Sequence, residues 1–250
     1  MSDLTGRTAL VTGSARGVGK AVALRYASLG ANVVVNYSGD TTNAERTVEE
    51  IRALGVEAIA VRADVSRVEE IDRLFAEAAD RFGRVDIVVA NAGVEIIDQP
   101  MLEATEKDFD RLYAINAKGT FFTLQRAAMH IADNGRIIYI GSSTTCNAFP
   151  GVGLYGSSKM GARYLVQVLA MEVGNRGITV NTILPTTIEG AGVFTDIADD
   201  DPYQQMSRAR PLGGRMGRPD DVADAAEYFA GPLASWVSGQ ALLVSGGAQQ

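Results

Sequence analysis

Short apolar runs alternate along the chain with longer segments in which apolar residues recur at helical spacing. Such alternation is typical of a parallel sheet covered by helices. The strand-like runs are 8–12, 32–36, 58–61, 85–90, 136–141, 178–184 and 241–244, and the helical segments are 21–29, 45–54, 68–81, 102–131, 155–175 and 221–233. We therefore predict an α/β fold with a doubly wound sheet of seven parallel strands and helices on both faces.

The predicted boundaries between helices and strands coincide with glycines. A residue with positive φ ends a helix without strain, and glycine adopts that conformation most readily. The glycines that stand between a helical segment and the next strand are Gly30, Gly55, Gly83, Gly135 and Gly177. Their placement supports the predicted order of elements.

One domain spanning residues 1–250 is predicted. Runs such as 33–35 and 88–89 consist of valine without polar alternation, as expected for strands buried on both faces of a parallel sheet. No shift in composition marks a linker, and no internal repeat is evident. The irregular stretch 186–218 contains Gly, Pro and the acidic run 199–201, and we predict that it forms a mobile substrate flap.

The composition excludes several classes of function. A formal net charge of −7 provides no positive field for phosphate backbones or anionic lipid, so nucleic acid and membrane surfaces are not expected partners. A single cysteine, Cys146, and a single histidine, His130, exclude an intramolecular disulfide and make a His/Cys metal site unexpected. The N-terminal residues lack the pattern of a signal peptide and no apolar run approaches 18 residues, so a cytoplasmic location is expected.

A glycine-rich segment directly follows the first predicted strand and opens the first predicted helix. Its sequence is Thr12-Gly13-Ser14-Ala15-Arg16-Gly17-Val18-Gly19, with the glycines spaced Gly-x3-Gly-x-Gly. Without Cβ atoms, such a turn lets backbone N–H groups and the positive end of the helix approach a pyrophosphate. The position after the first strand predicts a dinucleotide site.

A second group of polar residues lies in the middle of the chain. Tyr155 and Lys159 are four residues apart at the start of a helical segment, which puts them on one face, one turn apart. Ser142 follows the fifth strand, and the carboxyl ends of parallel strands open towards the ligand crevice of an α/β sheet. We therefore expect the three side chains to converge.

These residues suit proton transfer. The unperturbed tyrosine pKa of about 10 is too high for a base at neutral pH. A lysine ammonium about 5 Å away contributes roughly 3 kcal/mol at an effective dielectric constant of about 20, or about two pKa units in favour of tyrosinate. Tyr155 is thus a candidate general acid/base.

Taken together, the motifs resemble the short-chain dehydrogenase/reductase family over nearly the whole chain. The resemblance implies a Rossmann-type fold and four catalytic residues. It makes Tyr155 the general acid/base, Ser142 the holder of the substrate oxygen, and Lys159 the residue that lowers the tyrosine pKa and binds the ribose hydroxyls. Asn116 would support a proton-relay water. Ser143 is the rival to Ser142, which the thirteen-residue spacing to Tyr155 favours.

The resemblance also implies cofactor contacts along the sheet edge. Thr186 and Gly190 replace residues common in the family near the nicotinamide, so Thr186 or Thr187 is expected to compensate. The implied cofactor-binding residues are Gly13, Ser14, Arg16, Gly17, Val18, Gly19, Asn36, Tyr37, Ser38, Asp64, Val65, Asn91, Ala92, Gly93, Tyr155, Lys159, Pro185 and Ile188.

Charge favours NADP(H) over NAD(H). An aspartate at the end of the second strand would repel a 2′-phosphate, and this chain has Asn36-Tyr37-Ser38 there. Arg16 can place a guanidinium near that phosphate, while Tyr37 and Ser38 offer hydroxyl donors. Asp40 lies nearby and is expected to fall beyond the contact.

The expected activity is hydride transfer between NADP(H) and a small-molecule carbonyl or alcohol, most simply reduction of a ketone. By resemblance, β-ketoacyl-carrier-protein reductases and related ketone reductases are the nearest kind. Oxidation of an alcohol or sugar is the alternative, and a non-catalytic NADP-binding sensor or scaffold is the rival from another class. The resemblance implies a homotetramer or homodimer. Residues expected to shape the substrate pocket are Glu95, Thr144, Phe149 and Leu154.

Overall fold

A single sheet of seven parallel strands forms the centre of the molecule. The computed structural model describes residues 2–195, 198 and 200–248, and the strands lie in the order β3-β2-β1-β4-β5-β6-β7. Their bounds are β1 (Thr8–Val11), β2 (Asn32–Tyr37), β3 (Ala58–Arg62), β4 (Val85–Ala90), β5 (Ile131–Ile140), β6 (Thr179–Pro185) and β7 (Ala241–Val244). The predicted seven-stranded parallel sheet is confirmed.

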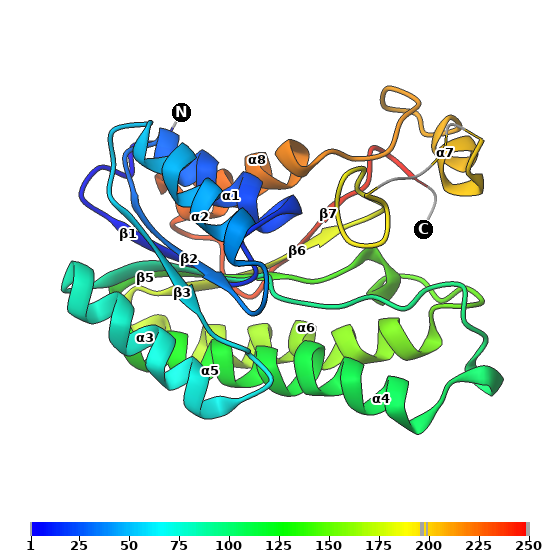
Figure 1. Cartoon of the computed structure of the whole chain (residues 1–250), viewed down its shortest axis with the longest axis horizontal. Coiled ribbons are helices and arrows are strands. Elements are labelled where there is room, and N and C mark those ends of the chain that lie inside the picture. Colours follow the sequence, from blue (N-terminus) through cyan, green and yellow to red (C-terminus); the bar gives the residue numbers. More distant parts are fainter. Residues whose placement is uncertain (1, 196–197, 199, 249–250) are drawn as a thin grey trace.

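Helices cover both faces of the sheet (Figure 1). On one face lie α1 (Gly17–Ser28), α2 (Thr41–Arg52) and α8 (Pro219–Ala230), and on the other lie α3 (Val68–Phe82), α5 (Thr120–His130) and α6 (Gly153–Val173). The shorter elements are α4 (Glu106–Leu112), α7 (Pro202–Ser207), the π-helix η2 (Tyr113–Gly119) and the 3-10 helices η1 (Met101–Glu103), η3 (Ser143–Thr145), η4 (Gly174–Arg176) and η5 (Pro232–Ala234).

Alternate residues of the inner strands enter two separate hydrophobic cores. In β1, Ala9 and Val11 pack beneath α1, α2 and α8, whereas Leu10 packs beneath α3, α5 and α6. Leu10 also aligns with Val34 of β2 and Val88 of β4, both fully buried. Because side chains of a strand point alternately to the two faces, both faces must be apolar. The runs of valine in the sequence have this origin.

Two predicted boundaries are wrong. The segment 102–131 is not one helix: η1, α4, η2 and α5 follow one another, and its last residue already begins β5. Gly135 does not end a helix with positive φ, because β5 already includes it and Asn134 adopts the left-handed conformation, with a φ of 62°. Gly135 serves close packing instead: a Cβ atom there would lie 2.7 Å from the carbonyl oxygen of Ala132.

The strand order positions the functional site. The chain winds outwards from β1 to β3 and then returns to continue on the other side of β1 with β4. The loops that follow β1 and β4 therefore leave the sheet in opposite directions, and ligands bind at such a reversal in open α/β sheets. The predicted flap, residues 186–218, follows β6; it contains α7 and a bridge between Ile188 and Gly217. Residues 196, 197 and 199 of the flap lie outside the described residues.

Candidate functional site

A cavity of 640 Å³ opens along the carboxyl ends of the strands. Its wall is built by the turns after β1, β2, β3, β4, β5 and β6, by the start of α6 and by the first part of the flap. Segments that are distant in the sequence therefore meet at this one edge, as the topology requires.

The glycine-rich turn forms one end of the cavity. Gly13 and Gly17 have φ values of 62° and 57°, which favour glycine. A Cβ atom on Gly19 would lie 2.5 Å from both the carbonyl oxygen of Gly13 and the side-chain nitrogen of Asn91. The turn thus brings backbone and the first turn of α1 against the cavity at positions where a larger residue does not fit. Such a surface fits a pyrophosphate.

Buried polar side chains hold this turn in place. Asn36 accepts a hydrogen bond from the Gly13 N–H (3.1 Å) and donates to the carbonyl oxygen of Ala63 (3.0 Å). Ser14 is fully buried; its hydroxyl donates to the Val11 carbonyl oxygen (2.7 Å) and accepts from the Asn36 N–H (3.2 Å). Asn36 lines the cavity, whereas the buried Ser14 is not among the lining residues and supports the turn from behind.

The turn after β4 is tied to the same structure. Asn91 donates its side-chain N–H groups to the carbonyl oxygens of Thr12 (2.9 Å) and Gly13 (3.1 Å). The Thr12 hydroxyl oxygen in turn accepts from the N–H groups of Asn91 (2.9 Å) and Ala92 (3.0 Å). Asn91, Ala92 and Gly93 all line the cavity, as predicted from the resemblance.

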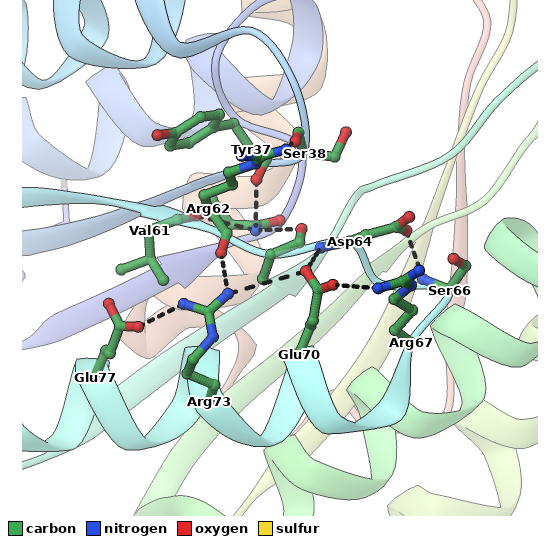
Figure 2. Close-up of polar contacts among 12 residues, drawn as sticks. Tyr37, Ser38, Val61, Arg62, Asp64, Ser66, Arg67, Glu70, Arg73 and Glu77 are labelled. Atoms are coloured by element: carbon green, nitrogen blue, oxygen red, sulfur yellow. Dashed lines mark hydrogen bonds and ion pairs between the residues drawn. The ribbon is translucent and has the colours of Figure 1, made fainter.

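A polar network supports the part of the cavity where the turns after β2 and β3 meet (Figure 2). Arg62 donates from Nε to the carbonyl oxygen of Ser38 (3.1 Å), and the guanidinium of Arg73 contacts the carbonyl oxygen of Arg62. Glu70 accepts the backbone N–H of Asp64 (2.8 Å). These contacts fix the backbone at Ser38 and Asp64, which line the cavity beside Tyr37 and Val65; all four are predicted cofactor positions.

Arg16 and Asp40 face the same part of the cavity. Arg16 is exposed and immediately precedes α1. Asp40 also lines the cavity, which corrects the expectation that it lies beyond contact. Its carboxylate caps α2, accepting from the backbone N–H (3.1 Å) and side-chain N–H (2.6 Å) of Asn43. These hydrogen bonds, with a smaller contribution from Arg16, hold the pKa of Asp40 below its usual range.

Ser142, Tyr155 and Lys159 converge on the cavity as the sequence predicts. Ser142 lies two residues beyond the end of β5, and the other two occupy the first turns of α6. Ser142 accepts hydrogen bonds from the N–H (3.2 Å) and hydroxyl (2.9 Å) of Thr144. Lys159 Nζ is 6.0 Å from the Tyr155 ring centroid, and a Cβ atom on Gly93 would lie 2.7 Å from that nitrogen. Ser143, the rival to Ser142, is not among the lining residues.

Burial dominates the charge states of Tyr155 and Lys159. Desolvation, followed by the nearby Glu95 carboxylate, raises the pKa of Tyr155 well above 10, while a hydrogen bond with Ser142 acts in the opposite direction. Desolvation lowers the pKa of Lys159 to about 8, against an attraction to Glu95 that raises it. The expected lowering of the Tyr155 pKa by Lys159 is therefore not found. Burial of the phenol is the largest effect on this pKa.

Asn116 lies behind the cavity instead of on its wall. It is fully buried within η2, a short π-helical segment of the kind often found at functional sites. Its side chain accepts from the Val94 N–H (2.9 Å), donates to the Val94 carbonyl oxygen (2.8 Å) and donates to the Ser158 hydroxyl (2.9 Å). Asn116 thereby fastens the loop after β4 to α6, where Tyr155 and Lys159 are located.

The turn after β6 completes the wall. Pro185, Thr186 and Ile188 line the cavity, together with Gly190. Arg210, a buried residue of the flap, donates to the Thr186 hydroxyl oxygen (3.3 Å) and contacts that of Thr187. Thr186 is therefore the member of the Thr186/Thr187 pair that faces the cavity.

Glu95 was predicted to shape the substrate pocket, but its hydrogen-bond partners could not be predicted from the sequence. The carboxylate accepts hydrogen bonds from the Tyr155 hydroxyl (3.1 Å) and from the Val193 N–H of the flap (3.2 Å). No local pattern signals a contact between residues sixty positions apart. Of the other predicted pocket residues, Thr144 bonds to Ser142, and neither it nor Phe149 or Leu154 is part of the wall.

Other features of the described residues bear on the class of site. Among residues 2–195, 198 and 200–248, no three His, Cys, Asp or Glu side chains are grouped as metal ligands would be. No helix within these same ranges has the length and apolar character needed to cross a membrane. Cys146 is a free, exposed thiol, and His130 stacks on Phe75 with ring centroids 5.7 Å apart.

Known proteins share this architecture over their whole length. A family model described as enoyl-(acyl carrier protein) reductase matches residues 13–249. A hydroxynaphthalene reductase-like protein of Metarhizium brunneum is 37% identical, over 98% of this chain and 96% of the relative. A dehydrogenase/reductase crystal structure from Sinorhizobium meliloti is 37% identical with a TM-score of 0.92, over 99% of this chain and 97% of that one. A short-chain dehydrogenase from Burkholderia cenocepacia, crystallised with NADP, is 33% identical with a TM-score of 0.90, over 98% of both chains.

Proposed function

We propose, because this chain belongs to the short-chain dehydrogenase/reductase family, that it reduces a ketone or aldehyde with NADPH. The protein is an oxidoreductase that transfers a hydride between a nicotinamide cofactor and a carbonyl or alcohol carbon. One observation carries the proposed site: Ser142, Tyr155 and Lys159 meet on the wall of the same cavity that the glycine-rich turn lines.

The cavity wall fits a dinucleotide. In the proposal, the turn from Gly13 to Gly19 holds the pyrophosphate, Asp64 and Val65 hold the adenine, and Pro185 and Ile188 hold the nicotinamide end. The glycines leave room there that a Cβ atom would fill. When bound, the cofactor supplies the hydride.

NADP(H) is the proposed cofactor. Arg16 is an exposed cation at the start of α1, and Tyr37 and Ser38 line the same part of the cavity. Asp40 is the opposing charge, but its carboxylate oxygens are engaged by Asn43 at the start of α2. A guanidinium and hydroxyl donors suit a phosphate, and the related structure from Burkholderia cenocepacia contains NADP.

The Tyr155 phenol is placed to exchange a proton with the substrate oxygen. In the direction of reduction, the protonated phenol, the form that burial favours, donates its proton to the carbonyl oxygen. We assign this donation to Tyr155, with Ser142 holding the oxygen. Lys159 is assigned to the ribose hydroxyls, and Asn116 to the support of a proton-relay water. The flap, residues 186–218, is assigned to cover the substrate.

A homotetramer, or a homodimer, is the proposed assembly. The outer surfaces of α5 and α6 expose Phe121, Met129, Met160, Tyr164 and Met171. A second surface near β7 exposes Leu233, Trp236 and Leu242. Clustered exposed apolar residues mark interaction sites. We also propose a cytoplasmic location, because the free Cys146 thiol suits a reducing compartment.

Replacement of the phenol hydroxyl tests the proposed function. Wild-type protein should oxidise NADPH in the presence of a panel of ketones, followed by loss of NADPH absorbance. Tyr155→Phe should bind NADPH with similar affinity and lose activity by about 100-fold or more, because the proton donor is gone. Equal rates for both proteins would remove Tyr155 from the reaction. Binding of NADPH without turnover of any carbonyl compound would favour a sensor or scaffold.

A further inference from the structure

The Glu95 carboxylate lies in direct contact with the phenol assigned to proton transfer. Glu95 belongs to the loop after β4 and lines the cavity. Its Oε1 atom accepts a hydrogen bond from the Tyr155 hydroxyl at 3.1 Å. Its other oxygen accepts the Val193 N–H of the flap at 3.2 Å. The phenol proposed to serve the substrate is therefore engaged by an acceptor from the protein itself.

The flap approaches the Glu95 carboxylate closely at Gly192. Gly192 has a φ of 58°, and a Cβ atom there would overlap the carboxylate oxygens of Glu95. The flap can approach Glu95 closely only because position 192 is glycine. Val193 and Phe194 then continue the cavity wall beside it. Glu95 is thus held between the phenol and the flap.

Substrate binding changes the partners of this carboxylate. To donate to a carbonyl oxygen, the Tyr155 hydroxyl must turn from Glu95 Oε1, because a hydroxyl has a single proton. An acceptor that loses its donor in a partly buried site costs free energy unless another donor replaces it. A donor on the substrate, one or two atoms from the reacting carbonyl, would lie within reach, since the two oxygens share the same phenol.

We propose that Glu95 is a specificity-determining residue that selects neutral carbonyl substrates with a hydroxyl group next to the reacting carbonyl. The substrate hydroxyl donates to Glu95 Oε1 while Tyr155 and Ser142 hold the carbonyl oxygen. This inference rests on the proposed reductase function and adds the substrate class.

Charge narrows the class further. A carboxylate beside the carbonyl would meet the negative charge of Glu95, so α-keto acids are disfavoured. An ammonium group would meet Lys159, whose buried cation already interacts with Glu95. A hydroxyl group offers a donor without either conflict.

Three matched aromatic ketones test the proposal. Acetophenone, α-hydroxyacetophenone and phenylglyoxylate share a phenyl ketone and carry a methyl, a hydroxymethyl and a carboxylate group, respectively, on the carbonyl carbon. In wild-type protein, kcat/KM should be at least about tenfold higher for α-hydroxyacetophenone than for acetophenone, as expected for a hydrogen bond to a charged group. It should be lowest for phenylglyoxylate.

Variants of Glu95 assign the preference to its carboxylate. Glu95→Leu removes the acceptor and should bring the hydroxyketone-to-ketone ratio close to one. Glu95→Gln is nearly isosteric and should lower the ratio to an intermediate value while improving kcat/KM for phenylglyoxylate several-fold. Glu103→Gln removes the same charge from an exposed residue outside the cavity and should keep the wild-type ratio. Thermal unfolding establishes that each variant is folded. If Glu95→Leu does not fold, the comparison of wild type with Glu95→Gln decides the outcome.

A wild-type ratio near one, or an unchanged ratio in both Glu95 variants, would overturn the proposal for Glu95 and leave the reductase function standing. Failure of the function looks different, since none of the three ketones would then oxidise NADPH. In that case calorimetry on the NADPH-loaded protein compares binding of the same ketones. Equal affinities for acetophenone and α-hydroxyacetophenone would then overturn the Glu95 proposal as well.

Discussion

Burial decides the charge of the two titrating residues at the centre of the cavity. Lys159 is 4% exposed and pairs with no carboxylate at hydrogen-bond distance among the described residues, so its ammonium is poorly solvated. The Tyr155 phenol is similarly buried and has Glu95 as its neighbour. Burial disfavours the charged form of both side chains; Glu95 adds to this effect at Tyr155 and opposes it at Lys159. A neutral, proton-bearing phenol is consistent with a role as general acid.

The buried ammonium of Lys159 should make stability depend on pH. Its pKa is about 8 in the folded protein and about 10.4 when unfolded, so the unfolded state binds more protons between these values and stability rises with pH. Below about pH 8 the destabilisation is fully present. Lys159→Met removes it. The stability advantage of the variant over wild type should therefore shrink as the pH rises. Urea denaturation measures this difference in free energy of unfolding, which should fall by on the order of 2 kcal/mol from about pH 7 to about pH 10. A constant difference would contradict the buried charge.

Arg16 should decide between the two nicotinamide cofactors. Arg16→Ala removes the exposed cation assigned to the 2′-phosphate, and the Kd for NADPH should rise about tenfold while that for NADH changes by less than about twofold. Fluorescence titration with both cofactors measures this. Arg46→Ala removes an exposed arginine of α2 outside the cavity and should change neither value. Parallel losses for NADPH and NADH in Arg16→Ala would assign the arginine to the pyrophosphate instead.

At the scale of elements, the turn between β1 and α1 depends on close approach of backbone segments. The carbonyl oxygen of Gly13 and the side chain of Asn91 occupy the space beside Gly19. Asn36 and Thr12 tie the same turn to β2 and β4. The turn is therefore rigid on one side and open to the cavity on the other, which is the arrangement that an anion-binding helix start requires.

Gly19→Ala should disrupt this turn. The new Cβ atom would lie 2.5 Å from two polar atoms and 2.9 Å from the Cα atom of Ser14, so the backbone must shift. We expect a loss of about 1–3 kcal/mol in the free energy of unfolding, as for other overpacked sites, and a weaker affinity for NADPH. Thermal denaturation and cofactor titration measure both. Gly174→Ala, where a Cβ atom meets nothing within 4 Å, should be neutral or slightly stabilising. Equal behaviour of the two variants would refute the close-approach argument.

At the scale of the whole molecule, two apolar surfaces lie on different elements. Tyr164 on α6 is 66% exposed, and Trp236 near β7 is 99% exposed. Within the described residues, β7 is the edge strand of the sheet and pairs with β6, and an edge strand can pair with another chain. Two surfaces of this kind can generate a tetramer with two types of interface.

Charged substitutions should dissect the assembly. Tyr164→Glu and Trp236→Glu should each convert a tetramer to dimers, and the double variant should be monomeric, because a carboxylate buried in an apolar interface is strongly disfavoured. Size-exclusion chromatography with light scattering gives the masses. Leu54→Glu, an exposed apolar residue in the turn before β3, should leave the mass unchanged. A monomeric wild-type protein would show that neither surface is an interface at the concentration used.

The sequence alone determined the order of elements, the seven parallel strands and most of the cavity wall. These features depend on short-range rules: strand and helix periodicity, glycine where backbone approaches closely, and the four-residue spacing of Tyr155 and Lys159. Seventeen of the eighteen predicted cofactor positions line the cavity, each from its place at the end of a strand or the start of a helix; Ser14, predicted from the same turn, instead donates its hydroxyl to the carbonyl oxygen of Val11.

Tertiary structure decided what could not be read locally. The contact of Glu95 with Tyr155, the anchoring of Asn116 on Val94 and the link from Arg210 to Thr186 join residues that are distant in the chain. Their geometry depends on how helices pack on the sheet, which no window of sequence contains. The charge state of Tyr155 also depends on tertiary structure. A lysine one turn away was expected to lower the pKa of Tyr155, but burial raises it, and burial is a property of the whole fold.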